Sequence, residues 1–136
     1  MIDVVVADDQ EIFRVGMTEI LARAEDVRIL GQPQSSEELL SALKTSTPDV
    51  LVLSTGFVPA FGKIQRLLQG RKIALVMLAE VAYARWLRAQ AVVHRSMEGP
   101  GIVEALRRVA RGELFVQSRS SDVRKDQSKP TRSRGN

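Results

Sequence analysis

The chain has 136 residues, 44% of them hydrophobic, which suits one domain of ordinary size with its own core. It contains no cysteine and one histidine, His94, which excludes disulfides, thiolate metal sites, cysteine nucleophiles and multi-histidine metal sites. The net charge of +4 comes from residues 117–136, because basic and acidic residues balance over residues 1–116. The charge of the main body therefore gives no argument for nucleic-acid binding.

The sequence carries no pattern of a targeting or membrane segment. The N-terminus lacks a charged stretch followed by a long apolar run, as a signal peptide would have. No apolar run reaches the ~18 residues that a membrane helix requires. We therefore expect a soluble, cytoplasmic protein that does not contact a membrane.

The first third of the chain alternates strand and helix patterns. Residues 3–7 and 27–31 predict two short strands rich in β-branched residues. Asp8 lies three residues before Glu11, the spacing of a capping box that would open a helix between these strands. Ser35 with Glu38 has the same spacing and predicts the second helix. Apolar residues recur at helical spacing in the first helix, at Ile12, Val15, Gly16, Ile20 and Leu21.

The same alternation continues to residue 112. The continuous apolar run 50–53 is typical of a central parallel strand, and a loop with Gly56, Pro59 and Gly62 leads to a helix that ends near Gly70. Further strands are predicted at 73–78 and 91–93, the latter being the last one, with a helix over 80–90 between them. Gly99 and Pro100 open a final helix to Gly112. Five strand–helix units predict an α/β fold, a parallel sheet with helices on both faces.

In such a sheet, binding sites form at the carboxyl ends of the strands, and Asp8 and Asp9 stand at the end of the first one. Two adjacent carboxylates can hold a hard divalent cation such as Mg²⁺. The alternative is that one carboxylate caps the following helix and the other is solvated. The spacing alone leaves both interpretations open.

Three segments, in this order along the chain, resemble the receiver domain of response regulators, in the branch with LuxR-type DNA-binding outputs. They are VVVADDQEIFRVGMTEIL, TPDVLVLS and IVEALRRVARGELFV. The resemblance runs from Ile2 to Val116. It implies that residues 1–116 form one receiver-like domain with the CheY-like, flavodoxin-like (βα)5 fold, a three-layer doubly wound sandwich whose parallel sheet has the strand order 2-1-3-4-5.

The resemblance also implies a site. In the family, an acidic pair and an aspartate after the third strand bind Mg²⁺, and that aspartate takes a phosphoryl group from a histidine kinase. A Thr or Ser after the fourth strand and a Lys after the fifth hold the phosphoryl oxygens. Asp8 and Asp9 match the acidic pair, but Ser54 stands in place of the phosphoacceptor aspartate, Ala79 in place of the hydroxyl residue and Arg95 in place of the lysine.

Each departure has a chemical consequence. A carboxylate is a nucleophile at neutral pH, whereas the Ser54 hydroxyl requires a base. The lost carboxylate also removes one metal ligand, so we expect no cofactor, with Mg²⁺ bound weakly or not at all at Asp8 and Asp9. Ala79 cannot donate a hydrogen bond. Arg95 keeps a positive charge and could pair with Asp8 or Asp9, and the alternative is that it is an exposed surface residue.

The region that would form the fourth helix and fifth strand is shorter than the family pattern, by about one helical turn. In the family this face reports phosphorylation to partners, so here it must be rebuilt. It contains the single Tyr and the single Trp of the chain, Tyr83 and Trp86. Buried, they belong to the core; exposed, they mark an interface together with Arg88.

Residues 117–136 are rich in Ser, Arg and Lys and nearly free of apolar groups, which predicts a disordered basic tail. Three interpretations stay open: an inert terminus, a linker toward an output domain, or a segment that contacts nucleic-acid phosphates without sequence preference. The tail has no aromatic residues to stack on bases, which weakens the last of these.

The sequence as a whole predicts a degenerate receiver domain, a non-enzymatic module that binds proteins in a two-component phosphorelay circuit. Its partners would be signalling proteins or a second copy of the chain. Two alternatives remain: a phosphoaccepting receiver that uses Ser54 or a residue of the acidic pair, and a DNA-associated regulator that acts through its basic tail.

Overall fold

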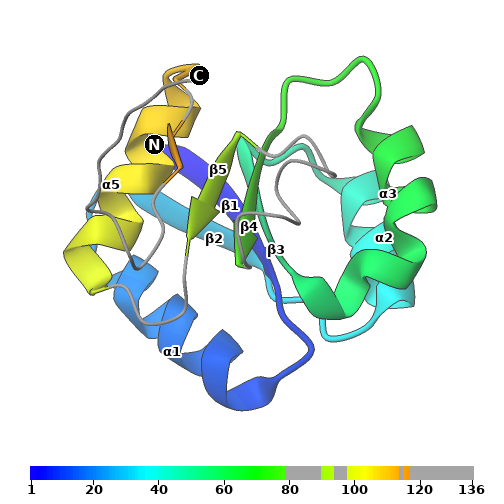
Figure 1. The fold of residues 1–136 in the computed structure, drawn as a ribbon, viewed down its shortest axis with the longest axis horizontal. Helices are drawn as coiled ribbons and strands as arrows, with labels where there is room; N and C mark the ends of the chain where they lie inside the picture. Colours follow the sequence, from blue (N-terminus) through cyan, green and yellow to red (C-terminus); the bar gives the residue numbers. More distant parts are fainter. Residues whose placement is uncertain (79–89, 94–97, 114, 117–136) are drawn as a thin grey trace, which may run out of the picture.

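A computed structural model gives the fold of the chain, and it describes residues 1–78, 90–93, 98–113 and 115–116 (Figure 1). The helix predicted over 80–90 falls almost wholly outside these ranges. So does the tail 117–136, and the domain boundary predicted after Val116 stays a prediction. None of the helices that the structure describes has the length and apolar character needed to cross a membrane.

The strands form one parallel sheet in the order β2-β1-β3-β4-β5-β6, so the predicted order 2-1-3-4-5 is confirmed. The strands are β1 (Ile2–Ala7), β2 (Val27–Gly31), β3 (Val50–Ser54), β4 (Ala74–Leu78), β5 (Ala91–Val93) and β6 (Phe115–Val116). The prediction that residues 91–93 form the last strand is wrong, because β6 adds a short parallel strand outside β5.

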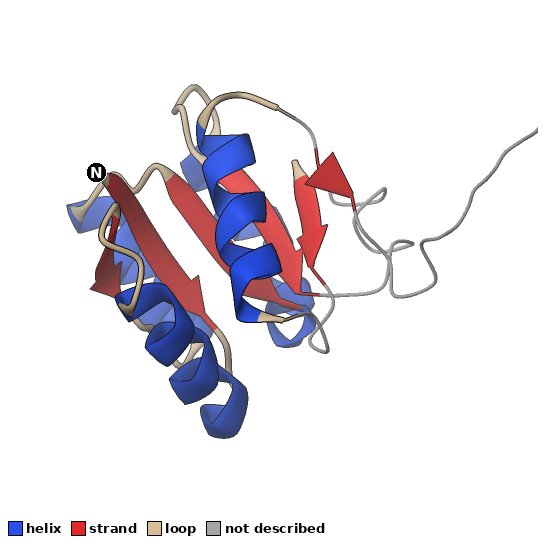
Figure 2. Ribbon diagram, turned by 90° about the vertical axis from the view of Figure 1, so that its left-hand side faces the viewer, coloured by secondary structure: helices blue, strands red, loops and turns tan. Residues whose placement is uncertain are grey.

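Helices cover both faces of the sheet, as predicted. Figures 1 and 2 show α1 and α5 on one face and α2 and α3 on the other. The helices are α1 (Glu11–Ala22), α2 (Ser36–Thr45), α3 (Phe61–Leu68) and α5 (Gly99–Ala110), with a 3-10 helix, η1 (Thr55–Ala60), after β3. The loop expected around Gly56, Pro59 and Gly62 is therefore wrong in part, since η1 spans the first two and Gly62 lies inside α3.

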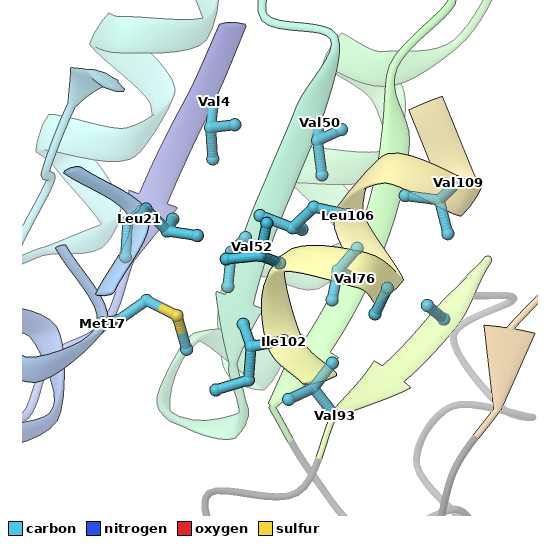
Figure 3. Close-up of a cluster of buried hydrophobic side chains, with 14 of the residues drawn as sticks. Val4, Met17, Leu21, Val50, Val52, Val76, Val93, Ile102, Leu106 and Val109 are labelled. Carbon is cyan, nitrogen blue, oxygen red and sulfur yellow. The ribbon is translucent and has the colours of Figure 1, made fainter. Parts of the chain in front are cut away.

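The core is divided by the sheet into two clusters, because neighbouring strand residues point to opposite faces. In β3, Val50 and Val52 face α1 and α5, whereas Leu51 and Leu53 face α2 and α3. Figure 3 shows the first cluster, where Val52 lies among Leu106 and Ile102 of α5 and side chains of the other strands. Burial on both faces explains why β3 is a continuous apolar run.

The start of α1 and its buried face differ from the prediction. The N-cap is Gln10, with no side-chain cap hydrogen bond, so the capping box of Asp8 and Glu11 does not form. The side chains buried on α1 are Arg14, Met17 and Leu21. Of the apolar set expected to pack inward, Ile12 is 78% exposed and Val15 is 50% exposed.

The predicted cap of α2 is confirmed, and the end of α5 follows a similar local rule. Ser35 is the N-cap of α2, and its hydroxyl accepts a hydrogen bond from the Glu38 amide at 3.2 Å. Beyond α5, Gly112 has φ +88°, a left-handed conformation that glycine adopts without a Cβ clash. These local signals fix where the two helices begin and end.

An ion pair joins the turn before β2 to α5. The Arg107 guanidinium donates two hydrogen bonds, of 2.8 and 2.9 Å, to the carboxylate of Asp26. These bonds lower the pKa of the Asp26 carboxyl below its ordinary value. Both side chains are partly exposed, so water and salt screen the pair.

We predict a pH-dependent effect of Asp26→Asn on stability. A carboxyl whose pKa is lowered by folding stabilises the native state above its unfolded pKa of about 3.9, and that contribution is lost as the pH falls through the folded pKa. Denaturant unfolding should therefore show the variant less stable than wild type near neutral pH, with the difference shrinking below about pH 4. Glu25→Gln, at an exposed neighbour, is the control and should give no comparable trend.

We also predict that the tail is dispensable but that β6 is not. Truncation after Val116 removes residues too polar to bury much apolar area, so the melting temperature should stay within about two degrees. Truncation after Glu113 also removes β6 and its pairing with β5, and should lower the melting temperature further. Equal melting temperatures for the two truncations would show that β6 contributes nothing to stability.

Candidate functional site

The candidate site lies where β1 and β3 end side by side. These strands pair in parallel, with Ala7 opposite Leu53, so the chain reaches Asp8 and Ser54 at the same edge of the sheet (Figure 1). The chain leaves β1 toward β2 and leaves β3 toward β4, in opposite directions across the sheet, which makes this edge a topological switch point, the place where α/β folds form binding sites. The structure thus brings three predicted site residues together: Asp8, Asp9 and Ser54.

Asp8 is wholly buried and forms part of the chain reversal that leads into α1. Its Oδ1 accepts a hydrogen bond from the backbone amide of Gln10 at 3.0 Å. Its carbonyl oxygen accepts a second one, also 3.0 Å, from Nη1 of Arg14. Arg14 is itself buried, 6% exposed, so a cation lies within the protein beside the acidic pair. The local backbone therefore already uses one carboxylate oxygen of Asp8.

Asp9 is exposed and reaches across from β1 to the end of β3. Its Oδ1 accepts a hydrogen bond from the Ser54 hydroxyl at 3.3 Å, and Ser54 is wholly buried. Its carboxylate also lies directly against Gly56, at the place where a Cβ on that residue would be. Asp9 is thus held between the hydroxyl at the end of β3 and the backbone of η1.

These residues do not fit a three-carboxylate Mg²⁺ site. Mg²⁺ requires octahedral coordination by oxygen atoms, which protein carboxylates supply together with several waters. Here Asp8 is engaged by the Gln10 amide, and Asp9 is engaged by Ser54, which supplies a neutral hydroxyl where a third carboxylate would be needed. Across the described part of the chain, no three His, Cys, Asp or Glu side chains gather in a group able to hold a metal ion.

The other predicted site residues lie outside the described residues. Ala79 directly follows the last described residue of β4, and Arg95 follows β5 by two positions. The interface candidates Tyr83, Trp86 and Arg88 belong to the same undescribed part, 79–89. The expected pairing of Arg95 with the acidic pair therefore stays a prediction.

Two residues of the site were missed by sequence reasoning: Arg14 and Gly56. Arg14 carried a usable signal, because residues 14, 17 and 21 share one face of a helix and the other two are apolar. A charged residue in that stripe indicates a buried polar contact. Gly56 carried no such signal, since its role depends on where the Asp9 side chain points.

Two curated proteins named as response regulators are similar to this chain in sequence. The response regulator GacA of Pseudomonas syringae is 30% identical over 126 residues, and GacA of Pseudomonas aeruginosa is 29% identical over 126 residues. Each alignment covers 85% of this chain and 58% of the relative, so the chain spans a little over half the length of the proteins that it matches. No family model matches the chain.

Solved receiver domains are similar to this chain in fold. The isolated REC domain of RcsB from Salmonella enterica superposes with a TM-score of 0.76 at 18% identity, over 89% of this chain and 96% of that one. The signal receiver domain of the putative response regulator NarL from Mycobacterium tuberculosis gives a TM-score of 0.70 at 22% identity, over 82% and 98%. The fold predicted from the sequence is therefore the fold observed.

We predict that Ser54→Asp creates a cation site. The new carboxylate would lie next to Asp9, and the repulsion between them should destabilise the domain until a cation binds. Mg²⁺ at ten times its Kd for the variant should then increase the free energy of unfolding of the variant by about 1.4 kcal/mol and so raise its melting temperature. Mg²⁺ should leave the melting temperature of wild type unchanged. Ser54→Asn, of the same size and neutral, is the control. A matched Mg²⁺ response in wild type would show that the native residues bind the ion.

Proposed function

We propose that this chain, which carries a response-regulator receiver domain, is an atypical receiver that acts in a two-component circuit by binding other proteins. The similarity to the GacA proteins and to solved receiver domains supports the signalling role. In this proposal the domain is cytoplasmic, is not an enzyme and is not phosphorylated. What it contributes is a surface whose shape does not depend on a phosphoryl group.

The observation that carries the proposal is the contact between Ser54 and Asp9. The residue at the end of β3 has a wholly buried hydroxyl that donates a hydrogen bond to a neighbouring carboxylate. A hydroxyl becomes a good nucleophile only when a base takes its proton in the transition state and the phosphoryl donor can approach it. Burial of Ser54 opposes that approach, and serine at position 54 means that β3 ends without a carboxylate to accept the phosphoryl group.

A second candidate, a receiver that accepts phosphate at Ser54 or at the acidic pair, is favoured by the same contact in one respect. Asp9 is placed to act as a base for the Ser54 hydroxyl. Two features speak against it. The O–H···O distance of 3.3 Å is longer than the ~2.7–2.8 Å of a strong hydroxyl hydrogen bond. Of the acidic pair, the Asp8 carboxylate is wholly buried, and the exposed Asp9 carboxylate is engaged by Ser54 and lies against Gly56.

Exposed apolar side chains on α1 support the protein-binding part of the proposal. Ile12 and Val15 lie one helical turn apart and point largely into solvent. One hollow between α1 and α5 is lined in part by Ile12 and Ile20, and a second one, farther along α1, is lined in part by Ile20 and Arg23. Exposed apolar groups gathered on one helix are typical of surfaces that contact proteins. Signalling partners and a second copy of this chain are both candidates for this role.

A third candidate, a DNA-associated regulator, depends on the basic residues of 117–136, which lie outside the described residues. Phosphate contacts by such a segment would be independent of sequence and strongly salt-dependent. Gel shifts on arbitrary DNA at low and high salt, with the chain truncated after Val116 as the control, separate this candidate from the first two. Binding that disappears with the tail would support it.

We predict that the domain accepts no phosphoryl group from a small donor. Incubation with acetyl phosphate and Mg²⁺ should leave the intact mass of the wild-type chain unchanged, because the residue at the end of β3 is a buried hydroxyl. Ser54→Asp is the matched variant, since it supplies the missing carboxylate and tests whether the rest of the site can still support transfer. Stoichiometric phosphorylation of wild type, mapped to Ser54, Asp8 or Asp9, would favour the second candidate.

A further inference from the structure

The loop after β3 contains a glycine that its backbone conformation does not require. Gly70 and Gly112 have positive φ angles, which favour glycine, but Gly56 does not. Gly56 is also exposed, so no tightly packed core surrounds it. Any residue could adopt this backbone conformation, and the reason for a glycine must lie in the space beside its Cα atom.

That space is filled by the Asp9 carboxylate. A Cβ built on Gly56 would overlap with Oδ1, Oδ2 and Cγ of Asp9, the whole of the carboxylate group. The neighbours of this Cβ are thus the far end of one side chain from a different loop. A side chain on residue 56 would therefore displace Asp9 and leave the backbone in place.

The position over Gly56 is also the position from which Asp9 meets Ser54. Oδ1 of Asp9, one of the atoms that a Cβ on residue 56 would displace, is the atom that accepts the Ser54 hydroxyl hydrogen bond. Gly56 and Ser54 thus act on the same carboxylate, one by leaving room and the other by donating a hydrogen bond. Both belong to the segment at the end of β3, whereas Asp9 belongs to the segment between β1 and α1.

We propose that Gly56 is a positioning residue: it leaves room for the Asp9 carboxylate to lie across the ends of β1 and β3 and to contact Ser54. We call this Asp9–Ser54 contact the latch. The latch brings the segment before α1 into contact with the end of β3. A ligand that binds at the ends of these two strands would first have to displace the Asp9 carboxylate from Gly56. This goes beyond the proposed function, because it concerns the resting geometry and does not depend on any partner.

A double-mutant cycle with Gly56→Ala and Asp9→Ala tests the latch. Alanine in place of glycine at a compatible backbone position usually stabilises a protein, because it restricts the unfolded chain. That gain in melting temperature should appear in full when Asp9 is absent, and should be reduced or reversed when Asp9 is present and must move. Gly62→Ala is the control, because a Cβ there meets nothing within 4 Å and its effect should be the same with and without Asp9.

A spectroscopic measurement separates positioning from a general effect on stability. In Gly56→Ala, the side-chain carboxyl ¹³C resonance of Asp9 should shift, as it should in Ser54→Ala, which removes the donor of the latch. The carboxyl resonance of Asp8, held by the Gln10 amide, should move much less. Additive melting temperatures in the cycle, together with an unchanged Asp9 resonance in Gly56→Ala, would overturn the proposal.

Discussion

The parallel pairing of β1 with β3 is the constraint on which both the core and the site depend. The two strands lie in the middle of the sheet, and from Val4 to Ala7 and from Val50 to Leu53 their residues are almost completely buried. Backbone amides and carbonyls buried this deeply require partners, so the register of the pair is fixed. Because Ala7 pairs with Leu53, both strands end at the same edge of the sheet, and Ser54 thereby comes within hydrogen-bonding distance of Asp9.

The buried Arg14 of α1 shows how a contact with another segment can override the apolar periodicity of a helix. The apolar spacing of residues 12, 15, 16, 20 and 21 predicts an inward face. Leu21 is buried as predicted, but Ile12 and Val15 are exposed, and Arg14 and Met17 are buried in their place. Arg14 reaches the carbonyl oxygen of Asp8, which satisfies one of its donors inside the protein. Helical periodicity sets which residues share a face, but a polar contact with another segment decides which face turns inward. For β3 the direction of the side chains did not have to be predicted, because the strand is apolar on both faces and each face packs against a pair of helices.

The site divides in the same way into what a sequence can and cannot supply. The positions of Asp8, Asp9 and Ser54 follow from the predicted strand ends and from the resemblance to receiver domains. Both can be recognised in the amino-acid sequence alone. The meeting of Asp9 with Gly56 depends on the direction of one side chain, which no spacing in the sequence encodes. The end of α1 nearest the site also differs, since Asp8 binds the amide of Gln10 where a capping box with Glu11 was expected.

The short strand β6 changes how the molecule can assemble. A sheet grows by adding a strand to an edge with unpaired backbone groups, and β5, with three residues, would be such an edge. Residues 115–116 occupy part of it, so an incoming strand would have to displace the chain's own backbone. The edge that remains on this side is that of β6, whose two residues offer an incoming strand fewer backbone groups than β5 would, so recruitment by strand addition is disfavoured there.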